Sequence, residues 1–364
     1  MHKTAAWPLA LIYAVLVVYA SLYPFSDWRD AGLAPWDFLS APMPRYWTGF
    51  DVAINVAGYI PLGSLLALSV LRAGRLRHAV LVPALCGLLL ALVMEALQSY
   101  LPARVPSKED LALNAVGAWV GAAATLLLER LGAIDRWSRV RARWFVPESR
   151  GGIVLLATWP LALLFPAAVP FGLGRVLERV NAALAQELEG TPFLDWLPVR
   201  DIVLQPLSPG AEMVCVALGL LIPCLLGFCI VRTRMQRVFF VLMMGLLGAA
   251  LTGLSAALSW GPAHAWAWLD LPAQLGMVLA FVLAVGLVFL PWRASAALVL
   301  LALGLYLSLL NQAPENPYFA QTLQEWEQGR FIRFHGLAQW VGWLWPYATL
   351  VYVMSQIWSR DAKN

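Results

Sequence analysis

The chain has 364 residues, of which 61% are apolar and 13% are charged. A soluble protein of this length needs more polar surface, and a disordered chain contains far fewer apolar residues. The composition therefore excludes both classes and predicts a polytopic membrane protein.

Ten apolar stretches are long enough, or nearly long enough, to cross a bilayer, which takes about 20 residues. They are residues 6–23, 50–71, 79–101, 111–128, 151–171, 211–231, 238–258, 273–290, 295–310 and 337–357. Because an open strand in lipid leaves its backbone groups unpaired, these stretches must be helices. The sequence predicts an all-α transmembrane bundle of about ten spans, in which prolines within several spans are tolerated.

The basic residues indicate the orientation of the bundle. If the N-terminus is cytoplasmic, the inner segments hold 16 of the 25 Lys and Arg residues but 4 of the 21 Asp and Glu residues. Basic residues favour the cytoplasmic side. We therefore expect cytoplasmic N- and C-termini in a bacterial cytoplasmic membrane. The net charge of +4 then reflects topology and indicates no nucleic-acid partner. Residues 1–20 can also be interpreted as a cleavable signal.

The pattern divides the chain into three parts. Residues 1–130 form a four-span domain, 131–150 a basic cytoplasmic linker, and 151–364 a six-span region with outer interfacial helices. The linker is expected to be a juxtamembrane helix held by anionic lipid. One interfacial helix is predicted over 173–189 and another after Asn316. The aromatic loop 24–49 is expected to lie on the outer leaflet.

The sequence contains no recognisable catalytic, metal or cofactor motif. It has no Ser-His-Asp order, zinc-protease signature, phosphate-binding loop or dinucleotide fingerprint. All four cysteines lie in apolar runs with no histidine nearby, and they are predicted to be small buried side chains. They are Cys86, Cys215, Cys224 and Cys229.

Polar residues gather at the predicted outer ends of three consecutive spans. The candidate binding residues are Asp51, Asn55, Glu95, Gln98, Arg104, Asp110 and Asn114. Several are three or four residues apart, so they share helix faces. Such residues are costly in a membrane unless they meet each other or line a wet cavity. They are expected to line one outward-facing pocket, either as a structural network or as a cleft for a polar or anionic headgroup.

These motifs resemble the VanZ-like membrane family. The resemblance rests on Leu22-Tyr-Pro-Phe25, Asp51-x3-Asn55-x5-Pro61-x-Gly63, Glu95-x-x-Gln98, Arg104 and Asp110-x3-Asn114-x-x-Gly117-x3-Gly121. It covers roughly residues 7–130 and implies an envelope role with an effect on teicoplanin-type glycopeptide susceptibility. The chain departs from the family pattern at Val105–Glu109, which puts the partner of Arg104 in doubt.

A second candidate site lies near the C-terminus, in a segment that resembles an extension of longer members of this family. Arg330, Arg333 and His335 alternate with aromatic residues. The pattern is typical of an aromatic belt with snorkelling arginines, and the alternative is contact with a phosphate headgroup.

Three functions follow from this sequence. The first is a non-enzymatic protein that binds a lipid-linked or anionic cell-wall component at the outer leaflet. The second is a transporter or flippase of an envelope lipid or glycan. The third is a membrane enzyme using Glu95 or Asp110 as acid or base. Membrane lipids, and a lipid-linked cell-wall precursor or glycan, are the partners expected. The sequence favours the first function and calls for no cofactor or metal.

Overall fold

The computed structural model describes most of the chain. The described residues are 6–22, 25, 27–30, 32, 34–42, 49–102, 104–165, 167–196, 207–313 and 332–361. Within them the ordered elements are helices, and the one β-type pairing is an isolated bridge between Phe145 and Val231. The prediction of an all-α fold is confirmed. The chain forms two compact units, residues 1–140 and 141–364.

Six helices in the described part of the chain are long and apolar enough to cross a membrane. They are Val52–Arg72, Leu76–Gln98, Lys108–Arg130, Pro209–Ile230, Arg234–Trp260 and Trp292–Leu310. The helices Ala6–Leu22 and Leu271–Leu287 are apolar but shorter. These segments coincide with predicted spans. A total of ten spans and cytoplasmic termini stay predictions.

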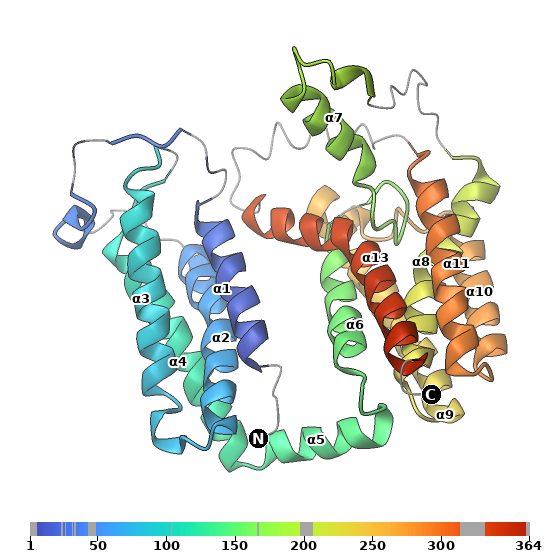
Figure 1. The fold of residues 1–364 in the computed structure, drawn as a ribbon, viewed down its shortest axis with the longest axis horizontal. Helices are drawn as coiled ribbons and strands as arrows, with labels where there is room; N and C mark the ends of the chain where they lie inside the picture. The colour runs from blue at the N-terminus through green and yellow to red at the C-terminus, as the bar shows by residue number, and fades with distance from the viewer. Residues whose placement is uncertain are drawn as a thin grey trace. The chain divides into compact units, whose positions relative to one another are not determined.

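The first unit is a bundle of four helices (Figure 1). They are α1 (Ala6–Leu22), α2 (Gly49–Arg72), α3 (Leu81–Gln98) and α4 (Lys108–Arg130), with short 3-10 turns at Asp37–Leu39 and Leu76–His78. Each of the four helices contacts at least two others, and α2 and α4 have the most extensive interface.

Glycines bring the backbones of α2 and α4 into direct contact. A Cβ atom on Gly63 would lie 2.0 Å from the carbonyl oxygen of Ala118, and one on Gly121 would lie 2.1 Å from that of Ile60. No side chain fits at such distances, so these positions require glycine. Small residues of α4 at helical spacing thus let α2 approach closely, as is common between membrane helices.

The outward faces of this bundle are apolar. On α3, Leu81, Leu85 and Leu89 are all more than half exposed and are spaced four residues apart. They therefore form one continuous stripe along the helix. Exposure of such a stripe is unfavourable in water and natural in lipid. The stripe thus supports a membrane environment for the first unit.

The remaining helices follow in chain order (Figure 1). They are α5 (Ala133–Trp144), α6 (Arg150–Ala162), α7 (Leu177–Glu187), α8 (Pro209–Ile230), α9 (Arg234–Trp260), α10 (Leu271–Leu287), α11 (Trp292–Leu310) and α13 (Ile332–Asp361), with 3-10 turns at Leu194–Trp196 and Pro262–His264. The predicted helix in the basic linker is α5. In the second unit α8 is central, because it packs against α6, α9, α10 and α11.

The expectation that residues 151–171 form one continuous helix is wrong. Helix α6 ends at Ala162, and its 13 residues measure about 20 Å along the axis, short of the roughly 30 Å of a bilayer core. The sequence has prolines at 160, 166 and 170, which lack the amide hydrogen that a helix needs. Residues 163–176, here called the inserted segment, leave the helix; where described, they contain no helix before α7 begins at Leu177.

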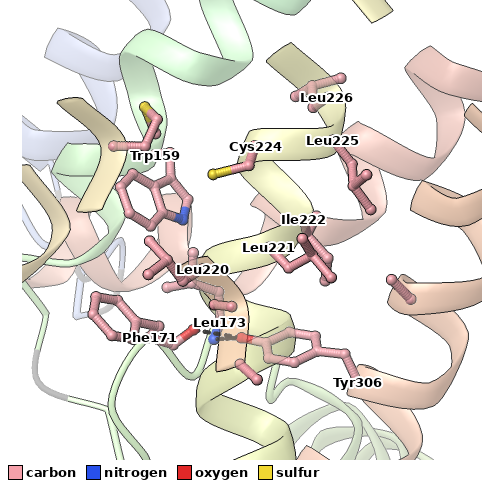
Figure 2. Close-up of a cluster of buried hydrophobic side chains, with 14 of the residues drawn as sticks. Trp159, Phe171, Leu173, Leu220, Leu221, Ile222, Cys224, Leu225, Leu226 and Tyr306 are labelled. Carbon is pink, nitrogen blue, oxygen red and sulfur yellow. Dashed lines mark hydrogen bonds between the residues drawn. The ribbon is translucent and has the colours of Figure 1, made fainter. Parts of the chain in front are cut away.

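Side chains from three helices satisfy backbone groups of the inserted segment. Ser255 of α9 donates a hydrogen bond to the carbonyl oxygen of Leu164 at 2.9 Å, and Tyr347 of α13 donates to that of Gly174 at 3.1 Å. Tyr306 of α11 donates to the carbonyl oxygen of Phe171 at 2.6 Å and accepts a bond from the amide of Leu173 (Figure 2). Buried backbone groups outside a helix need such partners, because an unpaired buried group is costly.

Phe171 is the most constrained residue of the inserted segment. Its φ angle is +60°, a value that bulky side chains rarely adopt, and its side chain is buried. Its ring stacks on the ring of Trp159 of α6, with 6.3 Å between the ring centroids (Figure 2). It meets the ring of Trp268 edge-on, with 5.9 Å between the centroids. Tight packing thus holds a backbone conformation that is unfavourable in isolation.

Two further expectations need correction. The helix predicted from residue 173 begins at Leu177, because Leu173 belongs to the inserted segment. Cys86 is exposed rather than buried, since it lies on an outward face of α3, whereas Cys215 and Cys224 are buried. The helix predicted after Asn316 lies outside the described residues.

Candidate functional site

A group of polar side chains lies at one end of the first unit. This polar cluster comprises Asn55, Tyr59, Glu95, Ser107, Glu109, Asp110 and Asn114. The residues come from the N-terminal half of α2, the last turn of α3, and the N-cap and first two turns of α4. The chain reverses between α3 and α4, so the end of one helix and the beginning of the next meet at the same level.

Ser107 sets the beginning of α4. It has extended backbone angles, and its hydroxyl accepts a hydrogen bond from the amide of Asp110 at 3.1 Å. This is the N-cap arrangement, which satisfies an amide that the helix leaves unpaired. It places Glu109 and Asp110 in the first turn, where the helix dipole favours carboxylates.

Glu95 and Glu109 meet through Ser107. The amide of Ser107 donates to Oε2 of Glu95 at 2.8 Å, and its hydroxyl donates to Oε2 of Glu109 at 3.0 Å. Glu95 is 3% exposed and Glu109 is 7% exposed. Two acidic side chains are therefore buried on either side of one serine, although isolated carboxylates are costly to bury.

A direct bond joins α2 to α4 at the cluster. The side-chain amide of Asn55 donates to Oδ1 of Asp110 at 2.5 Å. This contact explains how a polar residue near the beginning of α2 is accommodated, because the amide supplies a donor to a carboxylate. The bond also fixes the register of α2 against α4. Deeper in the bundle, glycines bring the backbones of the same two helices into contact.

Three buried polar atoms of the cluster have no hydrogen-bond partner. They are Oε1 of Glu109, Oδ1 of Asn114 and the hydroxyl of Tyr59. Asn114 is 7% exposed and Tyr59 is 4% exposed. Most buried polar groups in proteins are paired, so these three atoms retain hydrogen-bonding capacity that a polar group of another molecule can satisfy.

The other predicted residues of this end connect it to α1 and to the preceding loop. Gln98 donates to the carbonyl oxygen of Ser21 at 3.0 Å, and Arg104 donates to that of Ala20 at 3.3 Å. Lys108 donates to the carbonyl oxygen of Ala41 at 2.7 Å. These bonds tie α1 and part of loop 24–49 to the turn between α3 and α4.

Some predicted site residues lie outside the described part of the structure. They are the side chains of Asp51, Arg333 and His335, and the whole of Arg330. Of the seven residues predicted for the first site, the structure brings Asn55, Glu95, Asp110 and Asn114 to one end of the bundle, and Gln98 and Arg104 to the adjoining end of α1.

Sequence reasoning missed three members of the cluster. The pattern Ser107-x-x-Asp110 before an apolar run is a helix-start signal that identifies Ser107 as the N-cap. Tyr59 lies four residues after Asn55, so it shares the same face of α2. Nothing in the sequence distinguishes a buried Glu109 from a solvated acid in a first helical turn.

The arrangement is suited to binding through hydrogen bonds. It offers carboxylate, amide and hydroxyl groups in a largely buried setting, which strengthens polar interactions. The described members include no histidine or cysteine. The Ser107 hydroxyl, which donates to Glu109, also accepts from the amide of Asp110 and so serves as the cap of α4. The described residues also contain no group of three or more His, Cys, Asp or Glu side chains placed to hold a metal ion.

Comparison with known proteins finds one family match, and it falls in the first unit. The VanZ/LLP1 family model matches residues 9–129, which cover nearly all of α1 to α4 and contain the whole polar cluster. No curated protein and no solved structure matches the chain significantly. The resemblance predicted from the motifs is confirmed, and the first unit carries a VanZ-like domain over residues 9–129.

Proposed function

We propose that this protein is an envelope protein of the bacterial cytoplasmic membrane that binds the polar group of a lipid-linked envelope component at the polar cluster. Binding would change glycopeptide susceptibility of the teicoplanin type. The observation that carries the proposal is a set of unpaired buried polar atoms at the end of a bundle with apolar outer faces. A lipid presents its headgroup at that level while its chains lie against the apolar helices.

Glu95→Gln should abolish the phenotype without reducing the amount of protein. The glutamine carbonyl still accepts the bond from the Ser107 amide, whereas the negative charge is lost. The measurement is the teicoplanin susceptibility of a strain lacking the protein, complemented with wild type or variant, together with the amount of protein in membranes. Full activity of Glu95→Gln would show that the cluster is scaffolding, and loss of the protein would show a structural role.

Glu129→Gln is the matched control for this experiment. It makes the same chemical change on α4, at the end opposite the polar cluster. It should retain wild-type activity. A defect equal to that of Glu95→Gln would remove the link between the phenotype and the cluster.

The proposal requires the polar cluster to face the exterior. Reporter fusions after Arg75, Arg141 and Arg234 should report cytoplasmic positions, and fusions within 172–210 and 311–336 should report exterior ones, as the distribution of basic residues predicts. An exterior signal at Arg141 would reverse the orientation and contradict the proposed location.

A transport function is the second candidate, and the interrupted helix α6 favours it. Broken helices in transporters expose backbone groups at membrane depth and form substrate sites there. Here the inserted segment follows an apolar helix of only 13 residues. Flux of a labelled envelope lipid across proteoliposomes containing the full-length protein would support transport. Binding without flux would support the first proposal.

A further inference from the structure

The unpaired atoms of the polar cluster are mainly acceptors. Oε1 of Glu109 and Oδ1 of Asn114 accept hydrogen bonds, and the Tyr59 hydroxyl can either accept or donate. A ligand that satisfies them must therefore bring donors. The proposed function requires only a polar group, whereas the unpaired acceptors select a group that donates hydrogen bonds.

The helix geometry places the two residues Tyr59 and Asn114 at the contact between α2 and α4. Asn55 of α2 bonds Asp110 of α4, and a Cβ atom on Gly117 would lie 3.1 Å from the Cβ of Tyr59. Asn114 lies between Asp110 and Gly117 on the same face of α4, so it is directed towards α2 between these two contacts. Tyr59 and Asn114 are therefore buried between the helices, below Asp110.

The third unpaired atom adds negative charge. Glu109 precedes Asp110 by one residue, and its neighbour across Ser107 is the buried Glu95. The acidic groups of the cluster thus lie on α3 and at the beginning of α4. The neutral residues Asn114 and Tyr59 lie further along α4 and α2, towards the middle of the bundle.

These features favour a cationic amine over an anion. A primary ammonium carries three N–H donors and no acceptor, so it complements unpaired acceptors beside a carboxylate. A phosphate or carboxylate group brings acceptors and a like charge, which would be unfavourable beside Glu109. A quaternary ammonium has the charge but no N–H donor, and it would leave Asn114 unsatisfied.

We propose that the polar cluster binds a primary ammonium group, with Glu109 as its charged partner and Asn114 and Tyr59 as hydrogen-bonding partners. The proposal rests on the proposed function and specifies the ligand group of the same site. The amine can belong to a lipid headgroup or to a soluble molecule, and the test separates these sources.

The test uses full-length protein in detergent with an equimolar mixture of phosphatidylethanolamine, phosphatidylcholine and phosphatidylglycerol. Lipids retained by the protein are identified by native mass spectrometry. We expect retention of phosphatidylethanolamine over each of the others by about tenfold, the effect of losing one charge-assisted hydrogen bond. In a second arm, glycerophosphoethanolamine competes with the lipid. Effective competition would show that the water-soluble headgroup is sufficient for recognition, and failure to compete would assign recognition to the intact lipid.

Variants decide whether retention involves the cluster. Glu109→Gln and Tyr59→Phe should each reduce the preference for phosphatidylethanolamine, Glu109→Gln the more strongly because it removes the charge. Glu129→Gln should leave the preference unchanged. The melting temperature of each variant in the same detergent shows whether it is folded, and Tyr59→Phe keeps the test valid if Glu109→Gln is unstable.

The outcomes separate the two proposals. Equal retention of phosphatidylcholine and phosphatidylethanolamine, or a preference for phosphatidylglycerol that Glu109→Gln alters, would overturn the amine assignment and leave headgroup binding at this site intact. A preference that neither Glu109→Gln nor Tyr59→Phe changes would overturn the assignment of the site. Retention of no lipid above its proportion in the mixture would count against the proposed function as well.

Discussion

Gly117→Leu should prevent the accumulation of folded protein. Even a Cβ atom at this position would lie 2.2 Å from the carbonyl oxygen of Val56, and leucine adds three more carbons. Because α2 and α4 touch through their backbones here, the helices must separate to admit the side chain. Overpacking typically costs about 1–3 kcal/mol and can cost more, and this contact involves rigid backbone. The measurements are the amount of protein in membranes and its melting temperature in detergent.

Gly58→Ala is the matched control on α2. A Cβ atom there would meet nothing within 4 Å, so the helix should tolerate it. Alanine also has the higher helix propensity, by about 1 kcal/mol. We therefore expect wild-type amounts and an unchanged or slightly higher melting temperature. Normal accumulation of Gly117→Leu would contradict the backbone contact between α2 and α4.

The helical fold was predictable because lipid permits few alternatives. A long apolar run in a membrane must form a helix, and the prediction holds through Pro61, which lies inside the continuous helix α2. The glycine stripe of α4 was also readable, because small residues at helical spacing in an apolar helix indicate a close neighbour. The identity of that neighbour, α2, is tertiary information that spacing alone does not contain.

The polar cluster was predictable in part for a related reason. Polar residues in apolar segments are costly, so Asn55, Glu95 and Asp110 had to find partners, and similar depth suggested that they meet. Which atoms pair was not predictable. The Asn55–Asp110 bond depends on the packing of α2 on α4, and the burial of Glu109 depends on the turn that Ser107 begins.

The early end of α6 at Ala162 could not be predicted from hydropathy alone. Residues 151–171 are apolar enough for a span, and membrane helices often tolerate proline. Prolines at 160, 166 and 170 are too closely spaced for neighbouring groups to restore a regular helix. The side chains that satisfy the freed backbone come from α9, α11 and α13, roughly 80 to 180 residues further along the chain, so local sequence contains no sign of them.

Tyr306→Phe should destabilise the second unit strongly. The Tyr306 hydroxyl donates to the carbonyl oxygen of Phe171 and accepts from the amide of Leu173, and all three residues are buried. Phenylalanine keeps the ring but leaves two backbone groups unpaired in an apolar interior. Each costs about 1–3 kcal/mol, and the positive φ angle of Phe171 loses the contact that holds it. We expect a lower melting temperature and faster protease cleavage within residues 163–176.

Tyr347→Phe separates this effect from the general loss of a tyrosine hydroxyl. It removes a single bond, to the carbonyl oxygen of Gly174 at the end of the inserted segment, from a half-buried residue. Its melting temperature should therefore fall less than that of Tyr306→Phe, since only one acceptor is left unpaired and water can reach the site more easily. Equal melting temperatures for the two variants would show that the inserted segment does not depend on Tyr306. Cleavage within residues 163–176 at the wild-type rate in Tyr306→Phe would lead to the same conclusion, because packing of Phe171 against Trp159 and Trp268 would then be sufficient to hold the segment in place.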